Sequence, residues 1–150
     1  MPEANANVLD RVRSALGKLA TEVQTRKPNQ AFILIPPEGV LDACRIIVGL
    51  PGSRYATCTG IDTRDAVEVL YHFCFDAENY VVTLKTAAPK PFPELDSVTP
   101  AVPAAEWIER EMMDLLGIRF RNHPRPERLI LADNWPQGVY PLRRDYRHES

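Results

Sequence analysis

The chain has 150 residues, a formal net charge of −2, 45% hydrophobic residues and 25% charged residues. This length and composition are typical of one globular domain with its own core, and no apolar run reaches the roughly 18 residues that a membrane-spanning helix needs. The mildly acidic balance argues against nucleic-acid binding, which requires a strongly basic surface.

The first third of the chain predicts a helix, a strand and a second helix. Hydrophobic residues at steps of three and four positions predict a helix over residues 5–25. The apolar run at residues 31–35 predicts a short buried strand. Pro36 and Pro37 then open a helix over about residues 38–48, because the missing N–H of proline costs nothing in a first turn.

The middle of the chain predicts an antiparallel sheet. Residues 55–61, 66–76 and 80–86 resemble strands, and hydrophobic side chains alternate along the second of these segments. Residues 77–79 form a turn of hairpin length before the last strand. The fold class that follows is α+β: a mixed, largely antiparallel sheet covered by helices, with an extended C-terminal tail.

The last third begins with a proline-rich connection and a third helix. Five prolines in residues 87–103 predict a stiff extended loop. Residues 104–116 predict a helix that ends at Gly117, which takes the left-handed conformation. The inward stripe of this helix is expected to consist of Ile108, Met112, Leu115 and Leu116.

After this helix we expect two short strands and an irregular tail. Alternation predicts strands at residues 118–120 and 129–131. One α+β domain should cover residues 1–131, and an extended tail that docks on a partner should cover residues 132–150. Residues 117–150 carry 7 basic and 4 acidic side chains, an excess that favours a partner surface.

The predicted third helix carries a cluster of charge, EREMMD, at residues 109–114. Carboxylates in unlike environments can act as a general acid and a general base, so catalysis is one interpretation. The favoured interpretation is a solvated or partner-facing helix side. Arg110 stands four positions from both Glu106 and Asp114, and local ion pairs form at that spacing.

Other candidates for chemistry are few. His123 could be a metal ligand or a proton carrier, but no second histidine or cysteine stands at ligand spacing. The sequence has neither a C-x-x-C element nor a phosphate-binding glycine loop, so we expect no metal or cofactor on this chain. Three widely spaced cysteines and an N-terminus unlike a secretory signal favour a reducing compartment.

Arginines and aromatic residues gather in the C-terminal segment. RNA binding would use clustered cations and interleaved rings, but acidic residues dilute this cluster. Protein docking fits better, because such side chains anchor interfaces and a proline-stiffened chain loses less entropy on binding. Trp135, Tyr140 and Tyr146 would then be apolar anchors, and Arg143 and Arg144 would pair with carboxylates. The tail could also fold back on its own domain, and both can be true.

The segment EREMMDLLGIRFRNHPRPERLIL, followed by DNWPQGVYPLRRDY, resembles the signature of the C subunit of respiratory complex I, the NADH:quinone oxidoreductase. The same module occurs in membrane-bound, energy-converting nickel–iron hydrogenases and in formate hydrogenlyase. The resemblance implies a cofactor-free α+β subunit that packs against the large hydrogenase-like subunit and a neighbouring iron–sulfur subunit. Those partners would hold the nickel–iron centre, the iron–sulfur clusters or the quinone. It also implies a cytoplasmic subunit, peripheral on the cell membrane through its complex.

Two stretches depart from the family pattern. Glu127 replaces a residue that is usually basic, so one expected cation is an anion. Residues 138–141 read GVYP, a form that favours the hydrogenase-type complex over complex I, which is the alternative. A stand-alone enzyme and an RNA-binding module are remoter alternatives. The residues expected to form the signature or the partner interface are Glu109, Arg110, Glu111, Asp114, Gly117, Arg119, His123, Arg128, Trp135, Tyr140, Arg143, Arg144, Asp145 and Tyr146.

Overall fold

The computed structural model describes residues 2–148, with side chains from residue 7 onward. Its α-helices are α1 (Pro2–Leu16), α2 (Val40–Val48) and α3 (Glu106–Leu116). Its strands are β1 (Glu22–Lys27), β2 (Gln30–Leu34), β3 (Ser53–Asp62), β4 (Ala66–Phe75), β5 (Tyr80–Pro89), β6 (Glu94–Asp96) and β7 (Arg119–Arg121). None of these helices, within the described residues, is long and apolar enough to cross a membrane.

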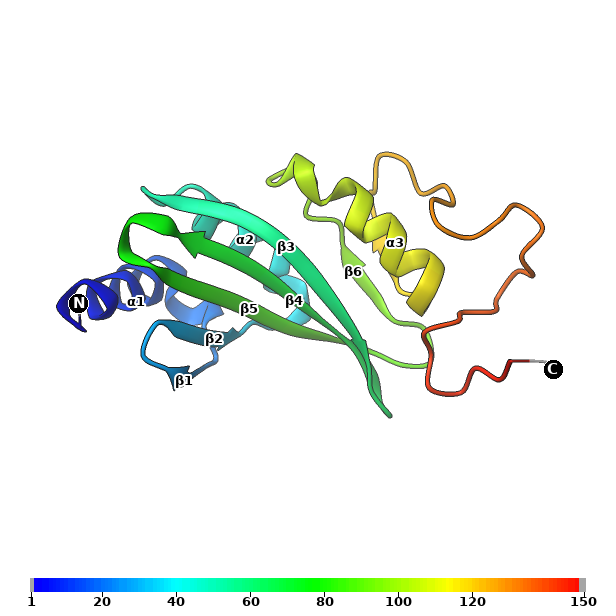
Figure 1. Cartoon of the computed structure of the whole chain (residues 1–150), viewed down its shortest axis with the longest axis horizontal. Coiled ribbons are helices and arrows are strands. Elements are labelled where there is room, and N and C mark those ends of the chain that lie inside the picture. Colours follow the sequence, from blue (N-terminus) through cyan, green and yellow to red (C-terminus); the bar gives the residue numbers. More distant parts are fainter. Residues whose placement is uncertain (1, 149–150) are drawn as a thin grey trace.

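Among the described residues the main sheet has five strands, in the order β1-β2-β5-β4-β3. The sheet is mixed, because β2 and β5 run parallel whereas the other neighbours are antiparallel. A second, small sheet pairs β6 with β7 in parallel. Figure 1 shows α1 and α2 against the main sheet and α3 beside β6. The predicted class, α+β with a largely antiparallel sheet, is confirmed.

The core lies between the main sheet and its helices. Successive side chains of a strand point to opposite faces, so alternate residues of β4 point inward, as the sequence predicts. The inward residues are fully buried: Val67, Val69, Tyr71, Phe73 and Phe75. Burying a large apolar side chain stabilises the fold by about 1.5–3 kcal/mol, so the inward side chains of β4 contribute strongly to the stability of the core.

The helix predicted over residues 5–25 is wrong in its second half. α1 ends before Gly17, which has a φ of 55°, and Glu22–Lys27 forms β1 instead. Glycine adopts positive φ without the steric cost of a Cβ, so it ends the helix here. Beyond it the β-branched residues Val23 and Thr25 alternate with unbranched polar residues, a pattern that suits a strand paired with β2.

The proline-rich stretch at residues 87–103 is not the continuous loop that the sequence predicts. β5 extends through Pro89, and β6 lies in the middle of the stretch. β6 pairs with β7, so that Leu95 lies opposite Phe120 and both side chains are buried. The partner strand stands beyond a whole helix in the sequence, and local patterns do not predict such parallel pairing.

Candidate functional site

Charged residues of α3 point into the protein, which differs from the predicted solvated helix side. The predicted apolar stripe is only partly right, because Ile108 and Leu115 are half-buried. Three charged residues are buried instead: Glu109, Arg110 and Asp114. A buried charge is tolerated when its polar atoms are hydrogen-bonded, so the partners of these three side chains define the site.

Glu109 connects α3 to the segment that precedes it. The Ser97 hydroxyl donates to Oε1 at 2.6 Å, and the Val98 N–H donates to Oε2 at 3.0 Å. Burial raises the pKa of Glu109 to about 7, although both hydrogen bonds act to lower it. Because this pKa lies above the ordinary value of 4.5, the carboxyl favours folding most below pH 4.5 and loses that contribution as the pH rises through about 7.

The sequence contains a signal for this burial that the predicted stripe missed. Glu109 stands three positions before Met112 and seven before Leu116, so all three share one helix face. Met112 and Leu116 are buried, and Glu109 is buried with them. A carboxylate in line with two buried residues therefore indicated an inward-facing acid.

His123 closes the turn after β7. The Arg125 N–H donates to Nδ1 at 3.0 Å, so the proton of a neutral ring lies on Nε2, which is 3.0 Å from the Glu106 carbonyl oxygen. Nε2 also lies 3.8 Å from Oε1 of Glu109, and both side chains are fully buried. Both ring nitrogens are thus hydrogen-bonded to main-chain atoms. Within the described residues, no three His, Cys, Asp or Glu side chains gather as a metal ion requires.

Arg110 holds the loop that follows this turn. Its Nε donates to the carbonyl oxygen of Glu127 and its Nη2 to that of Arg128, both at 3.0 Å. The ion pairs predicted with Glu106 and Asp114 are therefore wrong, because the guanidinium reaches main-chain carbonyls instead. At position 127 it is the carbonyl that makes this contact. The exposed side chain of Glu127 lies 3.8 Å from Arg125.

Asp114 binds the next three residues of the same loop. Its Oδ2 accepts the N–H groups of Leu129, Ile130 and Leu131 at 2.9, 2.8 and 3.1 Å. The strand predicted at 129–131 is therefore wrong, because the amides converge on one oxygen instead of pairing with another strand. Such a concave set of N–H groups is a known way to hold an anion. It leaves the side chain of Ile130 54% exposed.

Gly117 ends α3 as predicted, with a φ of 69°. The ring of Tyr140 lies against it, in the space that a Cβ at this position would occupy. Glycine is therefore required twice, once for the left-handed backbone and once for the close approach of the ring. This contact brings the tail back to the end of α3.

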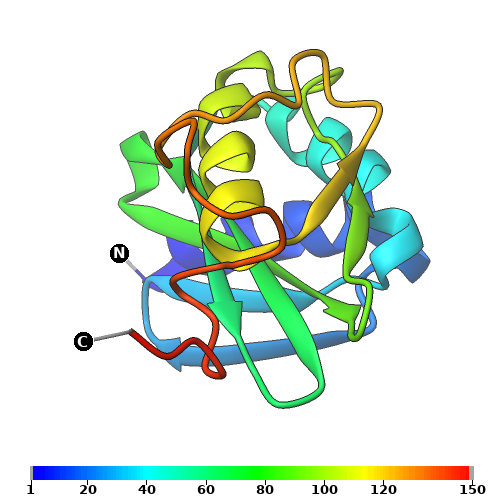
Figure 2. The same ribbon diagram turned by 90° about the vertical axis from the view of Figure 1, so that its right-hand side faces the viewer.

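Further contacts fix the tail along the same line. The Leu142 N–H donates to the Leu115 carbonyl at 2.9 Å, and Arg143 Nε donates to the Leu116 carbonyl. The Arg144 N–H donates to Asp62 Oδ2 at 2.7 Å. Figure 2 shows the chain after β7 winding across α3 to reach this point. The interpretation that the tail folds back on its own domain is confirmed.

The tail also holds itself together. Trp135 Nε1 donates to the Val139 carbonyl at 2.8 Å, and its ring lies 6.3 Å from that of Tyr146. Arg128 Nη1 donates to the Ala132 carbonyl at 2.8 Å. Trp135 and Tyr146 are half-buried. The predicted aromatic anchors Trp135 and Tyr146 thus bury part of their surface against their own chain.

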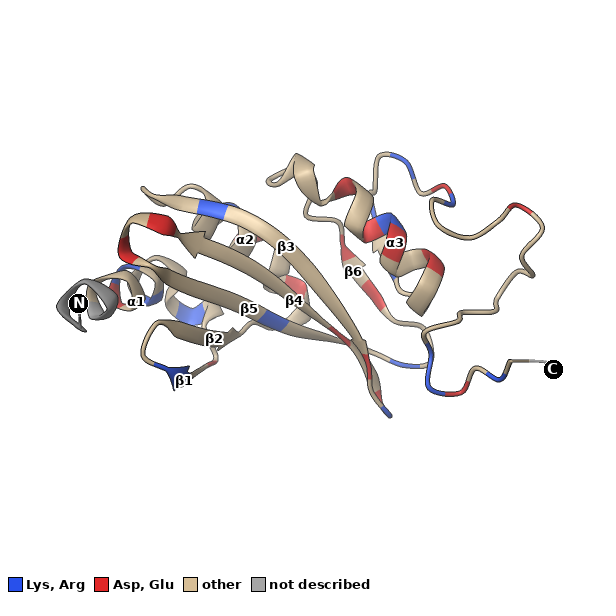
Figure 3. Cartoon of the chain, in the orientation of Figure 1, with Lys and Arg blue, Asp and Glu red and all other residues tan. Residues whose placement is uncertain are grey.

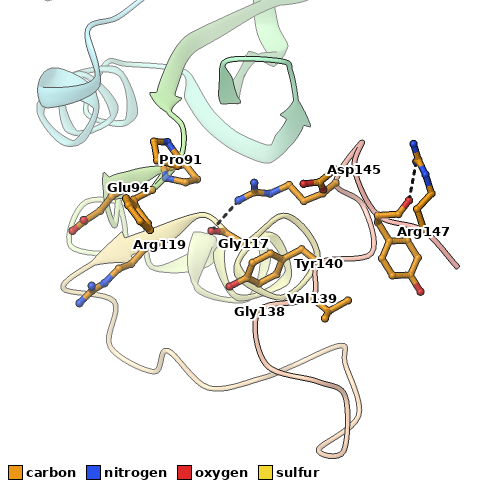
Figure 4. A pocket seen from close by; sticks show the side chains of 13 residues that line it. Pro91, Glu94, Gly117, Arg119, Gly138, Val139, Tyr140, Asp145 and Arg147 are labelled. Atoms are coloured by element: carbon orange, nitrogen blue, oxygen red, sulfur yellow. Dashed lines mark hydrogen bonds between the residues drawn. The ribbon is translucent and has the colours of Figure 1, made fainter. Parts of the chain in front are cut away.

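The tail borders an open cleft of about 790 Å³. Figure 4 shows Glu94 and Arg119 beside Gly117, with Tyr140 and Asp145 contributed by the tail. Arg119 and Asp145 are exposed. Figure 3 shows acidic residues along α3 and a mixture of basic and acidic residues on the segments that follow it.

One signature residue differs from its neighbours. Glu111 is half-exposed and makes no hydrogen bond or ion pair within the described part of the chain. Large apolar side chains near the site are also exposed, among them Trp107 at 63% and Leu142 at 59%. The sequence prediction named neither. Trp107 lies opposite the buried face of α3, a position that could have indicated it.

Comparisons with known proteins identify the family. Residues 33–150 match the family described as respiratory-chain NADH dehydrogenase, 30 Kd subunit. The chain is 31% identical over 141 residues to the C subunit of the F(420)H(2) dehydrogenase of Methanosarcina mazei, covering 90% of this chain and 89% of that protein. It is 41% identical over 98 residues to the C/D subunit of the NADH-quinone oxidoreductase of Methylococcus capsulatus, covering 65% of this chain but only 14% of that protein.

A solved structure shows the same fold. The membrane-bound sulfane sulfur reductase, an archaeal respiratory membrane complex, contains a chain that superimposes with a TM-score of 0.83. The match covers 95% of this chain and 85% of that chain, at 21% sequence identity. The family match over most of the sequence agrees with the signature around α3. The chain belongs to the family of the respiratory-chain NADH dehydrogenase 30 Kd subunit.

Proposed function

We propose that this chain is a non-catalytic structural subunit of a membrane-attached redox complex, docked on the large subunit through its C-terminal third. One observation carries the proposal. The three buried charges of α3 bind the Ser97 hydroxyl and main-chain groups at 98, 127–128 and 129–131. The bonds from Arg110 and Asp114 therefore fix the conformation of the loop at residues 127–131, whose exposed side we call the loop surface. That use leaves Glu109 and Asp114 poorly placed for a stand-alone enzyme.

The loop surface has the chemistry of an interface. Ile130 and Trp107 are more than half exposed, although both are large and apolar. Exposed aromatic and aliphatic residues beside arginines are typical of docking surfaces. Burying them against another polypeptide would stabilise the complex. We assign the tail at residues 132–150 to the same interface.

The proposed neighbours are the large, hydrogenase-like subunit and an iron–sulfur subunit. One relative is named as a C/D subunit, and the part matched by this chain is a small fraction of its length. A C-type segment within a longer C/D polypeptide supports a D-type large subunit as the neighbour. The nickel–iron centre, iron–sulfur clusters or quinone would then lie in the partners, and the whole complex would sit on the cytoplasmic face of the membrane.

The proposal specifies neither the electron donor nor the electron acceptor of the complex. The similar proteins are named for NADH, F(420)H(2) and sulfane sulfur, so one subunit fold occurs in complexes of different chemistry. This breadth supports a role in assembly. A hydrogenase-type complex stays our prediction from the GVYP stretch, with complex I as the alternative. The large subunit that co-purifies with the native chain would decide between them.

Co-purification tests the proposal. The chain is co-expressed with an affinity-tagged large subunit, as wild type and as Ile130→Asp. We expect the variant to lose most of its co-purification, because a charge would be buried in the interface. Asn7→Asp adds the same charge to an exposed position on α1 and should co-purify normally. Full recovery of Ile130→Asp, or failure of the wild type to bind, would contradict the proposal.

A further inference from the structure

A small groove separates α3 from the edge strand β3. Its volume is about 210 Å³, below the range of about 300–1,000 Å³ that small-molecule sites occupy. Gly60 allows the two elements to pack closely, since a Cβ there would lie 2.5 Å from Leu116 Cδ1 and 2.9 Å from Met112 Sδ. The lining residues are Cys58, Thr59, Gly60, Ile108, Glu111, Met112, Leu115, Leu116 and Leu142.

Most side chains in the walls of this groove are apolar, and Thr59 and Glu111 are the polar ones. Ile108 and Leu115 are half-buried on the α3 side, and Leu142 of the tail forms an exposed rim. Leu142 is held in place, because its N–H donates to the Leu115 carbonyl. Ile61, next to the groove on β3, is 43% exposed. The groove is therefore an open, largely apolar notch whose rim is hydrogen-bonded to α3.

Glu111 is the charged side chain in this lining. The lining contains no lysine or arginine, and Glu111 has no hydrogen bond or ion pair within the described residues. The carboxylate of Asp62 on β3 already forms an ion pair with Lys90 Nζ at 2.6 Å and accepts the Arg144 N–H at 2.7 Å. One unpaired negative charge thus stands beside apolar walls.

We propose that this groove receives an arginine or lysine side chain from the partner subunit. The aliphatic stem of such a side chain packs against Ile108, Leu115 and Leu142, and its charged head pairs with Glu111. Long cationic side chains bury their stems on apolar surface while the head stays polar, and they match a notch of this size and charge. The inference rests on the proposed function, since it locates one contact of that interface.

Glu111→Gln tests the contact, because it keeps the shape of the side chain and removes its charge. The dissociation constant of the chain for the large subunit is measured at low and at high salt. We expect a weakening of roughly tenfold or more at low salt. We also expect a smaller salt dependence than in wild type, since one ion pair is missing. Glu38→Gln alters an exposed glutamate near α2 and serves as the matched control, with an unchanged dissociation constant.

A cross-link identifies the occupant. Leu142→Cys, labelled with a short photo-reactive maleimide before assembly and irradiated in the assembled complex, should couple to a partner peptide that contains an arginine or lysine. Coupling to a second copy of this chain, or to a peptide without a cation, would overturn the inference. So would an unchanged dissociation constant in Glu111→Gln while wild type binds normally. Absence of wild-type binding would overturn the proposed function as well, so the two failures are distinguishable.

Discussion

Replacing Asp114 by leucine removes the one oxygen that accepts the N–H groups of Leu129, Ile130 and Leu131. Hydrogen bonds to a charged group contribute about 1.5–3 kcal/mol each, so three of them set an upper limit of about 9 kcal/mol. The loop at 129–131 is partly exposed, and water can reach the amides once it opens. We therefore expect a loss of about 2–4 kcal/mol in the free energy of unfolding.

Urea denaturation and hydrogen exchange measure this effect separately. The variant should unfold at lower urea, and the amides of 129–131 should exchange faster than in wild type. Assembly with the large subunit should suffer more than the stability of the isolated chain, because we assign the loop to the proposed interface. Asp133→Leu removes an exposed carboxylate from the tail and should change neither the urea midpoint nor the exchange of the 129–131 amides. Equal exchange rates in Asp114→Leu and wild type would refute the reasoning.

Three further predictions concern the pH response, the helix stop and the tail. The stability of Glu109→Gln relative to wild type should rise between pH 5 and pH 8. The reason is that the wild-type carboxyl, with its pKa raised to about 7, loses its stabilising contribution over that range. A constant difference in the free energy of unfolding between the two proteins, measured with urea at each pH, would contradict this. Gly117→Ala should lower the melting temperature more than Gly138→Ala, since both positions have positive φ but only the first would also displace Tyr140; equal losses would argue against the contact. Deleting residues 132–150 should leave a folded domain that no longer enters the complex, and a truncated chain that still co-purifies fully would count against it.

The sequence predicted the helix of the site better than its surroundings. Periodicity located α3 and glycine located its end, because both signals are local. The direction of the charges was not predictable in the same way. Arg110 and Asp114 bind main-chain carbonyls and amides of a distant loop. Almost every residue type carries these main-chain groups, so the sequence does not indicate which residues will be bound. For the same reason a charge cluster that seemed suited to solvent proved to be internal.

The tail shows a similar division. Its irregular backbone followed from its prolines, and arginines with aromatic residues indicated a docking role. The contact of Tyr140 with Gly117 depends on how the chain returns across α3, which no local pattern encodes. The contacts of the tail with α3 are observed, whereas its docking on a partner stays our proposal. Part of the tail closes the domain, and the rest of its surface is available to a partner.

Hydrogen–deuterium exchange, compared between the isolated chain and the assembled complex, tests the central claim most directly. Amides at residues 127–146 should become more protected on assembly, whereas those of β1 should exchange equally in both states. Protection confined to β1, or identical exchange throughout residues 127–146, would contradict the assignment of the C-terminal third to the interface.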